Sequence, residues 1–250
     1  MDTVLKATGL GKMYGGFAAL RSMDLTLPKG EIIGLLGPNG SGKTTFLKLC
    51  AGLLTPTTGT LEICGKPVGA ESKALVSYLP DRTYLSNRQK IREQLDYFQD
   101  FYSDFDRNRA EYMLRDLGIS LECRFGTLSK GNREKVQLEL VMSRRAKLYL
   151  LDEPIGGVDP AARDYILRTI LNNYDPEATV LISTHLIADV EPVLHGYLFL
   201  HQGQIVGAGR VKQVREETGK SLDELFREVF RCLPNYLSMS GRLPGGSWVC

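Results

Sequence analysis

The sequence has almost no excess of charge and no patterned cysteines. Its 250 residues hold 31 Lys and Arg against 29 Asp and Glu, so the formal net charge is +2. A balance this even gives no support to nucleic-acid binding through bulk charge. The five cysteines are scattered, and no pair has the C-x-x-C spacing of a zinc or redox site. Such cysteines fit a reduced cytosolic chain, where each fills apolar space.

Long apolar runs are missing as well. The N-terminal stretch MDTVLKATGLGKMYGG lacks the apolar core of a signal peptide. No stretch approaches the roughly 20 apolar residues that span a bilayer. We therefore expect a cytoplasmic protein, for which any membrane role requires a separate partner. Apolar residues still make up 43% of the chain, which is enough for a sizeable core.

The residue pattern changes twice along the chain. Residues 1–80 hold short β-rich runs separated by glycine, whereas glycine is scarce from about 82 to 146 and apolar residues there have helical spacing. From 147 the β/α alternation returns, with accessory helices at about 210–232 that we expect on the surface. The pattern predicts an α/β domain over 1–232 with an all-helical insert. Residues 233–250 are rich in Gly, Ser and Pro, and predict a flexible tail.

The most informative stretch is GPNGSGKTT at 37–45, which follows a strand-like run and precedes a helix-like run. Its spacing, G-x-x-x-x-G-K-T, is that of a phosphate-binding loop. Glycines let successive backbone N–H groups point inward around an anion, and the following helix adds positive charge at its N-terminus. Lys43 can reach the β- and γ-phosphates, and the Thr44 hydroxyl can bind Mg²⁺. The expected nucleotide contacts are Gly37, Asn39, Gly40, Ser41, Gly42, Lys43, Thr44 and Thr45.

A second motif supplies the carboxylates that this chemistry needs. KLYLLDEP at 147–154 is an apolar strand that ends in Asp152 and Glu153. A buried strand would place Asp152 beside the phosphate loop, where it can hold the Mg²⁺ shell. Glu153 is then placed to polarise a water for attack on the γ-phosphate. Together the motifs predict a site for ATP and Mg²⁺ with Lys43 and Glu153 as catalytic groups.

With these two motifs, the chain resembles the ATP-binding subunit of an ATP-binding-cassette (ABC) transporter over residues 1 to about 210. The motifs stand in the family's order, with LSKGN at 128–132 as the signature, GGVDP at 156–160 as the D-loop and LISTHL at 181–186 as the switch segment. The resemblance implies an α/β fold: a P-loop NTPase core of ABC-ATPase type with an inserted α-helical subdomain and an N-terminal antiparallel β subdomain.

The resemblance also implies roles for five residues. Ser129 and Gly131 would cap the γ-phosphate of an ATP bound by a second subunit, and Asp159 would lie at the seam between subunits. His185 would contact the γ-phosphate and orient the attacking water. Tyr14 falls where the family has an aromatic residue that stacks on adenine, with Phe17 as a near alternative.

Three positions depart from the family's usual pattern. Lys130 replaces a glycine, and it either adds a cation near the phosphates or points to solvent. Asn132 replaces a glutamine and has a shorter reach toward the ribose. Asp81 stands where the family has a glutamine that touches Mg²⁺ and joins the core to the insert. Asp81 either binds the metal through a hard anionic oxygen or is a solvated loop residue.

These parts imply a mechanism in which two copies enclose two ATP molecules and drive a separate transmembrane permease. The variant signature is most similar to that of bacterial export systems, so we expect a homodimer at the inner face of the membrane that powers export. The alternative is a soluble ABC-type ATPase, for example in iron–sulfur assembly, that uses the same clamp. A small-molecule kinase is disfavoured, because it would not need the signature or the switch histidine.

Overall fold

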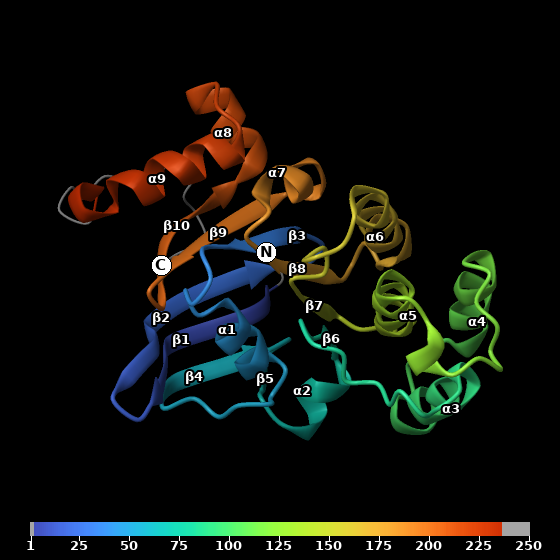
Figure 1. Ribbon diagram of the computed structural model, residues 1–250. Helices are drawn as coiled ribbons and strands as arrows, with labels where there is room; N and C mark the ends of the chain where they lie inside the picture. Colours follow the sequence, from blue (N-terminus) through green and yellow to red (C-terminus); the bar gives the residue numbers. More distant parts are fainter. Residues whose placement is uncertain (1–2, 237–250) are drawn as a thin grey trace.

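The computed structural model describes residues 3–236, with side chains described to residue 231 (Figure 1). The central sheet has the order β10 (Gln204–Arg210), β9 (Gly196–His201), β3 (Ile32–Leu36), β8 (Thr179–Thr184), β7 (Leu148–Asp152) and β6 (Val76–Leu79). Strands β9 to β6 are parallel, and β10 pairs antiparallel at one edge. The segments that follow β3, β7, β8 and β6 therefore emerge at the same edge of the sheet.

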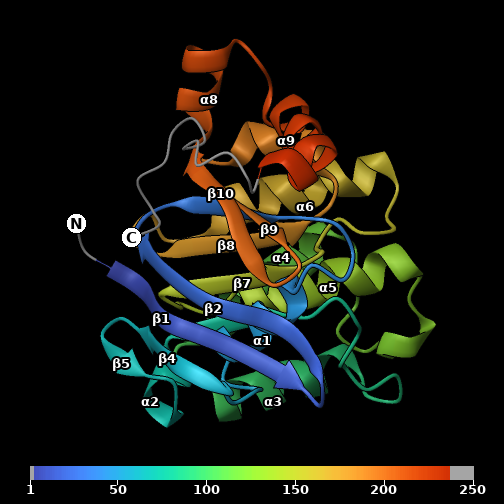
Figure 2. The ribbon, with the colours of Figure 1, turned by 90° about the vertical axis from the view of Figure 1, so that its left-hand side faces the viewer.

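A second, antiparallel sheet is built from the N-terminal part of the chain. Its order is β2 (Phe17–Pro28), β1 (Thr3–Tyr14), β4 (Thr58–Ile63) and β5 (Lys66–Pro67). Helix α1 (Lys43–Cys50) lies between the two sheets (Figures 1 and 2). Its Phe46 and Leu47 are fully buried in one apolar cluster with residues of both sheets. This packing fixes the helix that begins at Lys43.

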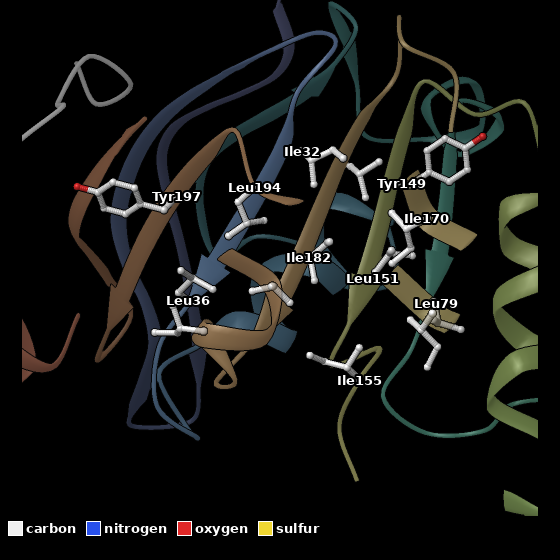
Figure 3. Packing of buried hydrophobic residues seen from close by; sticks show 14 of the residues in the cluster. Ile32, Leu36, Leu79, Tyr149, Leu151, Ile155, Ile170, Ile182, Leu194 and Tyr197 are labelled. Carbon is white, nitrogen blue, oxygen red and sulfur yellow. The ribbon is translucent and has the colours of Figure 1, made fainter. Parts of the chain in front are cut away.

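The other face of the central sheet is covered by helices. They are α6 (Pro160–Asn173), α7 (Ile187–Val190) and α9 (Leu222–Tyr236), together with α5 (Lys130–Met142). Figure 3 shows Leu151 and Ile182, from the neighbouring strands β7 and β8, close to Ile170 of α6. Apolar side chains cover both faces of the central sheet, so the sequences of its strands are continuous hydrophobic runs.

Helices α3 (Ile91–Phe101) and α4 (Arg107–Asp116) pack on α5 beside the sheet (Figure 1). They enclose an apolar cluster of their own, with Leu95, Leu114 and Phe125 fully buried. We call this group, residues 82–146, the helical insert. The mixed α/β core, the antiparallel β subdomain and the inserted helices agree with the predicted fold class.

Some elements differ from the sequence prediction. The short strand β5 and helix α2 (Ala70–Ala74) were not anticipated, because two to five residues give no readable periodicity. Helix α8 (Val211–Thr218) is largely exposed as expected. Helix α9 instead buries Leu222, Leu225 and Val229 against the core, and it extends through Tyr236. The remainder of the predicted tail, 237–250, lies outside the described residues.

No helix within the described residues is long and apolar enough to cross a membrane.

Candidate functional site

Residues 37–42 connect buried strand β3 to α1 in a shape that only glycine permits at two points. Gly40 and Gly42 have φ angles of 79° and 111°, in the left-handed region that other residues rarely adopt. A Cβ on Gly37 would lie 2.3 Å from the carbonyl oxygen of Leu200. The loop therefore turns tightly beneath the β9–β10 hairpin, and its glycines are required by the fold as well as by the predicted phosphate contacts.

Lys43 is the first residue of α1, and its side chain is buried. Its Nζ donates to the carbonyl oxygen of Gly37 at 2.7 Å and lies 3.5 Å from Glu153 Oε1. Burial lowers the pKa of Lys43, while the neighbouring carboxylate of Glu153 opposes that shift. The ammonium group is thus held inside the curve of the loop, at the place where phosphate oxygens would meet it.

Asp152 ends strand β7 and is only 1% exposed. Its Oδ1 accepts hydrogen bonds from Ser183 Oγ at 2.5 Å and from Thr44 Oγ1 at 3.2 Å. Burial is the main cause that raises the pKa of Asp152, and the nearby charges of Asp81 and Glu153 raise it further. A carboxylate with acidic neighbours and few cations around it is stabilised when a divalent cation binds.

The residues present fit a magnesium ion. Thr44, Asp152 and Asp81 offer a hydroxyl and two carboxylates, the hard oxygen ligands that Mg²⁺ prefers. In addition, the buried hydroxyl of Ser41 has no hydrogen-bond partner among the described residues. A buried polar atom without a partner in a phosphate-type loop is consistent with a ligand that completes it.

Glu153 follows Asp152 in a strained backbone conformation, with a φ angle of 49°. Its N–H donates to the carbonyl oxygen of Ser183 at 3.0 Å, which holds the turn against strand β8. Both of its carboxylate oxygens lie 3.1 Å from His185 Nδ1. The side chain of Glu153 is therefore fixed between Lys43 and His185, and it can accept a proton there.

An open cavity of about 310 Å³ extends from Lys43, Thr44 and Glu153 to the β1–β2 hairpin, and Asp152 and His185 lie outside its lining. Tyr14 and Phe17 pair at the end of that hairpin and are 46% and 65% exposed. Both line the cavity, and so does Asp81. The full lining is Tyr14, Phe17, Ala19, Asn39, Gly40, Ser41, Gly42, Lys43, Thr44, Thr45, Asp81 and Glu153. The structure thus brings most of the predicted contacts together, with both aromatic candidates at one end.

Ser129, Gly131 and Asp159 do not line this cavity. Ser129 caps α5 by accepting from the N–H of Asn132 at 3.2 Å, and Asp159 caps α6 by accepting from the N–H of Ala162 at 3.0 Å. Both caps are exposed at helix N-termini. A second subunit can therefore reach them, whereas this chain's own nucleotide site does not include them.

The side chain of Lys130 is 66% exposed, in agreement with the solvent-facing alternative. Its Nζ donates to the carbonyl oxygen of Gly157 at 3.2 Å and lies 3.8 Å from Glu134 Oε1. The side chain therefore links the LSKGN segment to the GGVDP segment of the same chain.

Comparison with known proteins decides the family. The family model for the ABC transporter domain matches residues 20–156, more than half of the chain. The chain belongs to the ABC transporter ATP-binding family. It is 31% identical over 219 residues to the ABC transporter ATP-binding protein YhaQ of Bacillus subtilis, covering 84% of this chain and 72% of that protein. It is 28% identical over 247 residues to the Nod factor export ATP-binding protein I of Cupriavidus metallidurans, covering 95% and 82%.

The fold of this chain is also similar to that of a solved member of the family. A solved structure of an ATP-binding subunit of an ABC transporter aligns with a TM-score of 0.82 and 28% identity, over 91% of this chain and 100% of that one. The ABC ATPase domain implies that this protein binds and hydrolyses ATP. ABC ATP-binding subunits of this kind work with a separate transmembrane permease.

Two side chains of this ABC site were missed by sequence reasoning. Ser183 donates to Asp152, and Tyr78 OH lies 3.5 Å from Asp152 Oδ2. Ser183 stands two residues before His185 and pairs directly with Asp152 across β7 and β8. The predicted strand LISTHL already indicated that Ser183 lies near Asp152, since neighbouring parallel strands end at the same edge of a sheet. Tyr78 gave no comparable signal, because nothing in SYLPD sets the direction of its side chain.

Proposed function

We propose that this chain is the ATP-hydrolysing subunit of an exporter, working as a homodimer on the cytoplasmic face of a membrane through a separate permease. The observation that carries the proposal is the convergence of Lys43, Asp152, Glu153 and His185 at the carboxyl edge of one sheet. Export is supported by the relative that is named for Nod factor export.

In the proposed mechanism, the loop 37–45 binds the phosphates of ATP through its N–H groups, and Lys43 binds the β- and γ-phosphates. Tyr14 stacks on the base, with Phe17 beside it. Thr44, Asp152 and Asp81 would hold Mg²⁺, which would supply positive charge beside the phosphate oxygens. These contacts position the γ-phosphate beside the Glu153 carboxylate.

Glu153 then takes a proton from water as the water oxygen bonds to the γ-phosphorus, and the bond from that phosphorus to the oxygen of ADP breaks, so that ADP and phosphate leave. His185 holds the carboxylate and the γ-phosphate in place. General-base assistance of this kind supplies about 10²- to 10⁴-fold in rate. Ser129 and Gly131 of one copy cap the γ-phosphate bound by the other, and Asp159 lies at the seam. This assignment is supported by the exposure of the Ser129 and Asp159 caps outside the chain's own cavity.

Co-purification from native membranes tests the permease assignment. The tagged chain is extracted in mild detergent, with a matched Lys43→Ala chain to show that capture does not depend on turnover. A multi-span membrane protein recovered in fixed stoichiometry with both chains supports the proposal. ATPase activity recovered only with soluble proteins would overturn it, and would favour a soluble ABC-type ATPase instead.

A further inference from the structure

Helix α6 is tied to the helical insert by polar contacts at its start, middle and end. Just before α6, the carbonyl oxygen of Gly157 accepts from Lys130. In the middle, the Tyr165 hydroxyl donates to Glu139 Oε1. At the end, the Arg109 guanidinium donates to the carbonyl and the side-chain oxygen of Asn173. Three separate contacts along one helix favour its movement together with the insert as a unit.

The middle contact is the unusual one, because Glu139 is 0% exposed within α5. Its Oε1 is satisfied by Tyr165, but its Oε2 has no hydrogen-bond partner among the described side chains. Burying a carboxyl group in an apolar interface is costly unless it is well paired. An apolar residue would fill the same space at a lower cost in folding free energy. We therefore explain the buried carboxyl group of Glu139 by its hydrogen bond with Tyr165.

Through Tyr165, Glu139 contacts helix α6, and α6 follows directly after the turn that carries Glu153. The N–H of Gly156 donates to the carbonyl oxygen of Glu153 at 2.9 Å, and Asp159 caps the first turn of α6. Between Asp152 and Pro160 the chain has no other regular element. A shift of α6 therefore moves the short turn that carries both Glu153 and Asp159.

We propose that Glu139 is a positioning residue: through Tyr165 it fixes α6 to α5, so that the helical insert sets the position of Glu153. The inference rests on the proposed role of Glu153 in hydrolysis. It gives this chain a route from insert to catalytic site that does not pass through Asp81, where the family's usual glutamine is absent.

The contact also depends on the charge of Glu139. Burial raises its pKa to about 7, and the Tyr165 hydroxyl, Arg109 and Lys135 favour the charged form while Asp116 opposes it. From the adjacent strand β6, Ser77 faces α5 and donates to a backbone carbonyl. An ionised carboxylate accepts a stronger hydrogen bond than a neutral carboxyl. The hydrogen bond from Tyr165 is therefore stronger above pH 7 than below it, although burial of the charged carboxylate lowers the stability of the fold there.

The test is steady-state ATP hydrolysis by Tyr165→Phe between pH 6 and pH 8.5. This change removes the hydroxyl and keeps the ring that packs beneath Lys135 Nζ, 4.6 Å away. At pH 8 we expect kcat to fall about 5- to 10-fold, the factor that corresponds to one net hydrogen bond. The KM for ATP should stay unchanged, since the phosphate loop is not touched. At pH 6 the loss should shrink to less than about twofold, because the neutral carboxyl holds Tyr165 only weakly.

Two controls separate positioning from packing. In a Glu139→Gln background, Tyr165→Phe should have the same small effect at every pH. Tyr174→Phe, at the tyrosine that follows α6, should behave as wild type. A kcat for Tyr165→Phe within twofold of wild type at pH 8, or a loss of the same size at all pH values, would overturn the inference.

Hydrogen exchange at pH 8 gives a second readout of the same contact. The amides at 161–166 should be less protected in Tyr165→Phe than in Tyr174→Phe, because only the first change removes the hydroxyl that donates to Glu139. Equal protection in the two variants would contradict the inference. If Glu153→Gln does not hydrolyse ATP while Tyr165→Phe and Tyr174→Phe both behave as wild type, the catalytic assignment of Glu153 stands and only the role of Glu139 is removed.

Discussion

His185 Nδ1 lies 3.1 Å from each carboxylate oxygen of Glu153. The pair bridges two neighbouring strands, since Glu153 follows β7 and His185 follows β8. Lys43 Nζ approaches the same carboxylate from the phosphate loop. The groups that would surround a γ-phosphate are therefore held to one another, and each can be tested by removing it alone.

Replacement of His185 by alanine should lower kcat by about 10²-fold or more, in the range for loss of an acid–base or orienting group. The KM for ATP should change by less than a few-fold, because the loop 37–45 still binds the phosphates. Phosphate release over a range of ATP concentrations measures both. His195→Ala is the matched control, since that histidine lies at the start of β9 and contacts Glu31. Equal effects of the two changes would remove His185 from the site.

Asp81→Ala should raise the Mg²⁺ concentration required for half-maximal activity. Its carboxylate lines the cavity and acts electrostatically on the buried Asp152, so its loss removes a hard ligand and negative charge from the metal site. A Mg²⁺ titration at saturating ATP measures the shift, with the exposed Asp100→Ala on α3 as the control. An unchanged titration would make Asp81 a solvated loop residue.

The two aromatic residues of the β1–β2 hairpin can be separated by mutation. Stacking on a base is worth roughly 1–3 kcal/mol, so loss of the stacking ring should weaken ATP binding by about 5- to 150-fold. We expect this for Tyr14→Ala and a smaller effect for Phe17→Ala. Equilibrium binding of a fluorescent ATP analogue provides the comparison. The reverse order would assign the stacking to Phe17.

Glu139→Gln should stabilise the protein at alkaline pH. Folding raises the pKa of this carboxyl from 4.5 to about 7, so between those values the folded chain keeps a proton that the unfolded chain has released. The contribution of Glu139 to the free energy of unfolding therefore falls as pH rises through that window, by about 3 kcal/mol in total. Relative to wild type, the variant should gain up to that amount at pH 8 and little at pH 5. Urea unfolding at both pH values measures this difference in the free energy of unfolding, with the exposed Glu122→Gln as the control. A gain in stability at pH 5 equal to that at pH 8 would contradict the account.

Most residues that line the cavity could be predicted from the sequence, but the contacts that hold the surrounding helices in place could not. Lys43, Thr44 and Asp152 could be predicted because their chemistry requires a fixed local spacing and a buried strand that ends at one point. The contacts of Lys130 with Gly157 and of Glu139 with Tyr165 could not, because each joins residues 26 or 27 positions apart whose meeting depends on how α5 packs on α6. The burial of α9 was missed for the same reason. Its apolar stripe was readable, but what it covers depends on the tertiary fold.

The most direct test of the central claim is ATP-dependent dimerisation of Glu153→Gln. Loss of the base should block hydrolysis while Lys43 and the loop still bind ATP, so two copies should stay closed around it. Light scattering after gel filtration with ATP and Mg²⁺ should show a dimer for Glu153→Gln and a monomer for Glu153→Gln/Ser129→Ala, whose signature cap is removed. Hydrolysis by Glu153→Gln at a rate near that of wild type, or a monomer in the presence of ATP, would contradict the account.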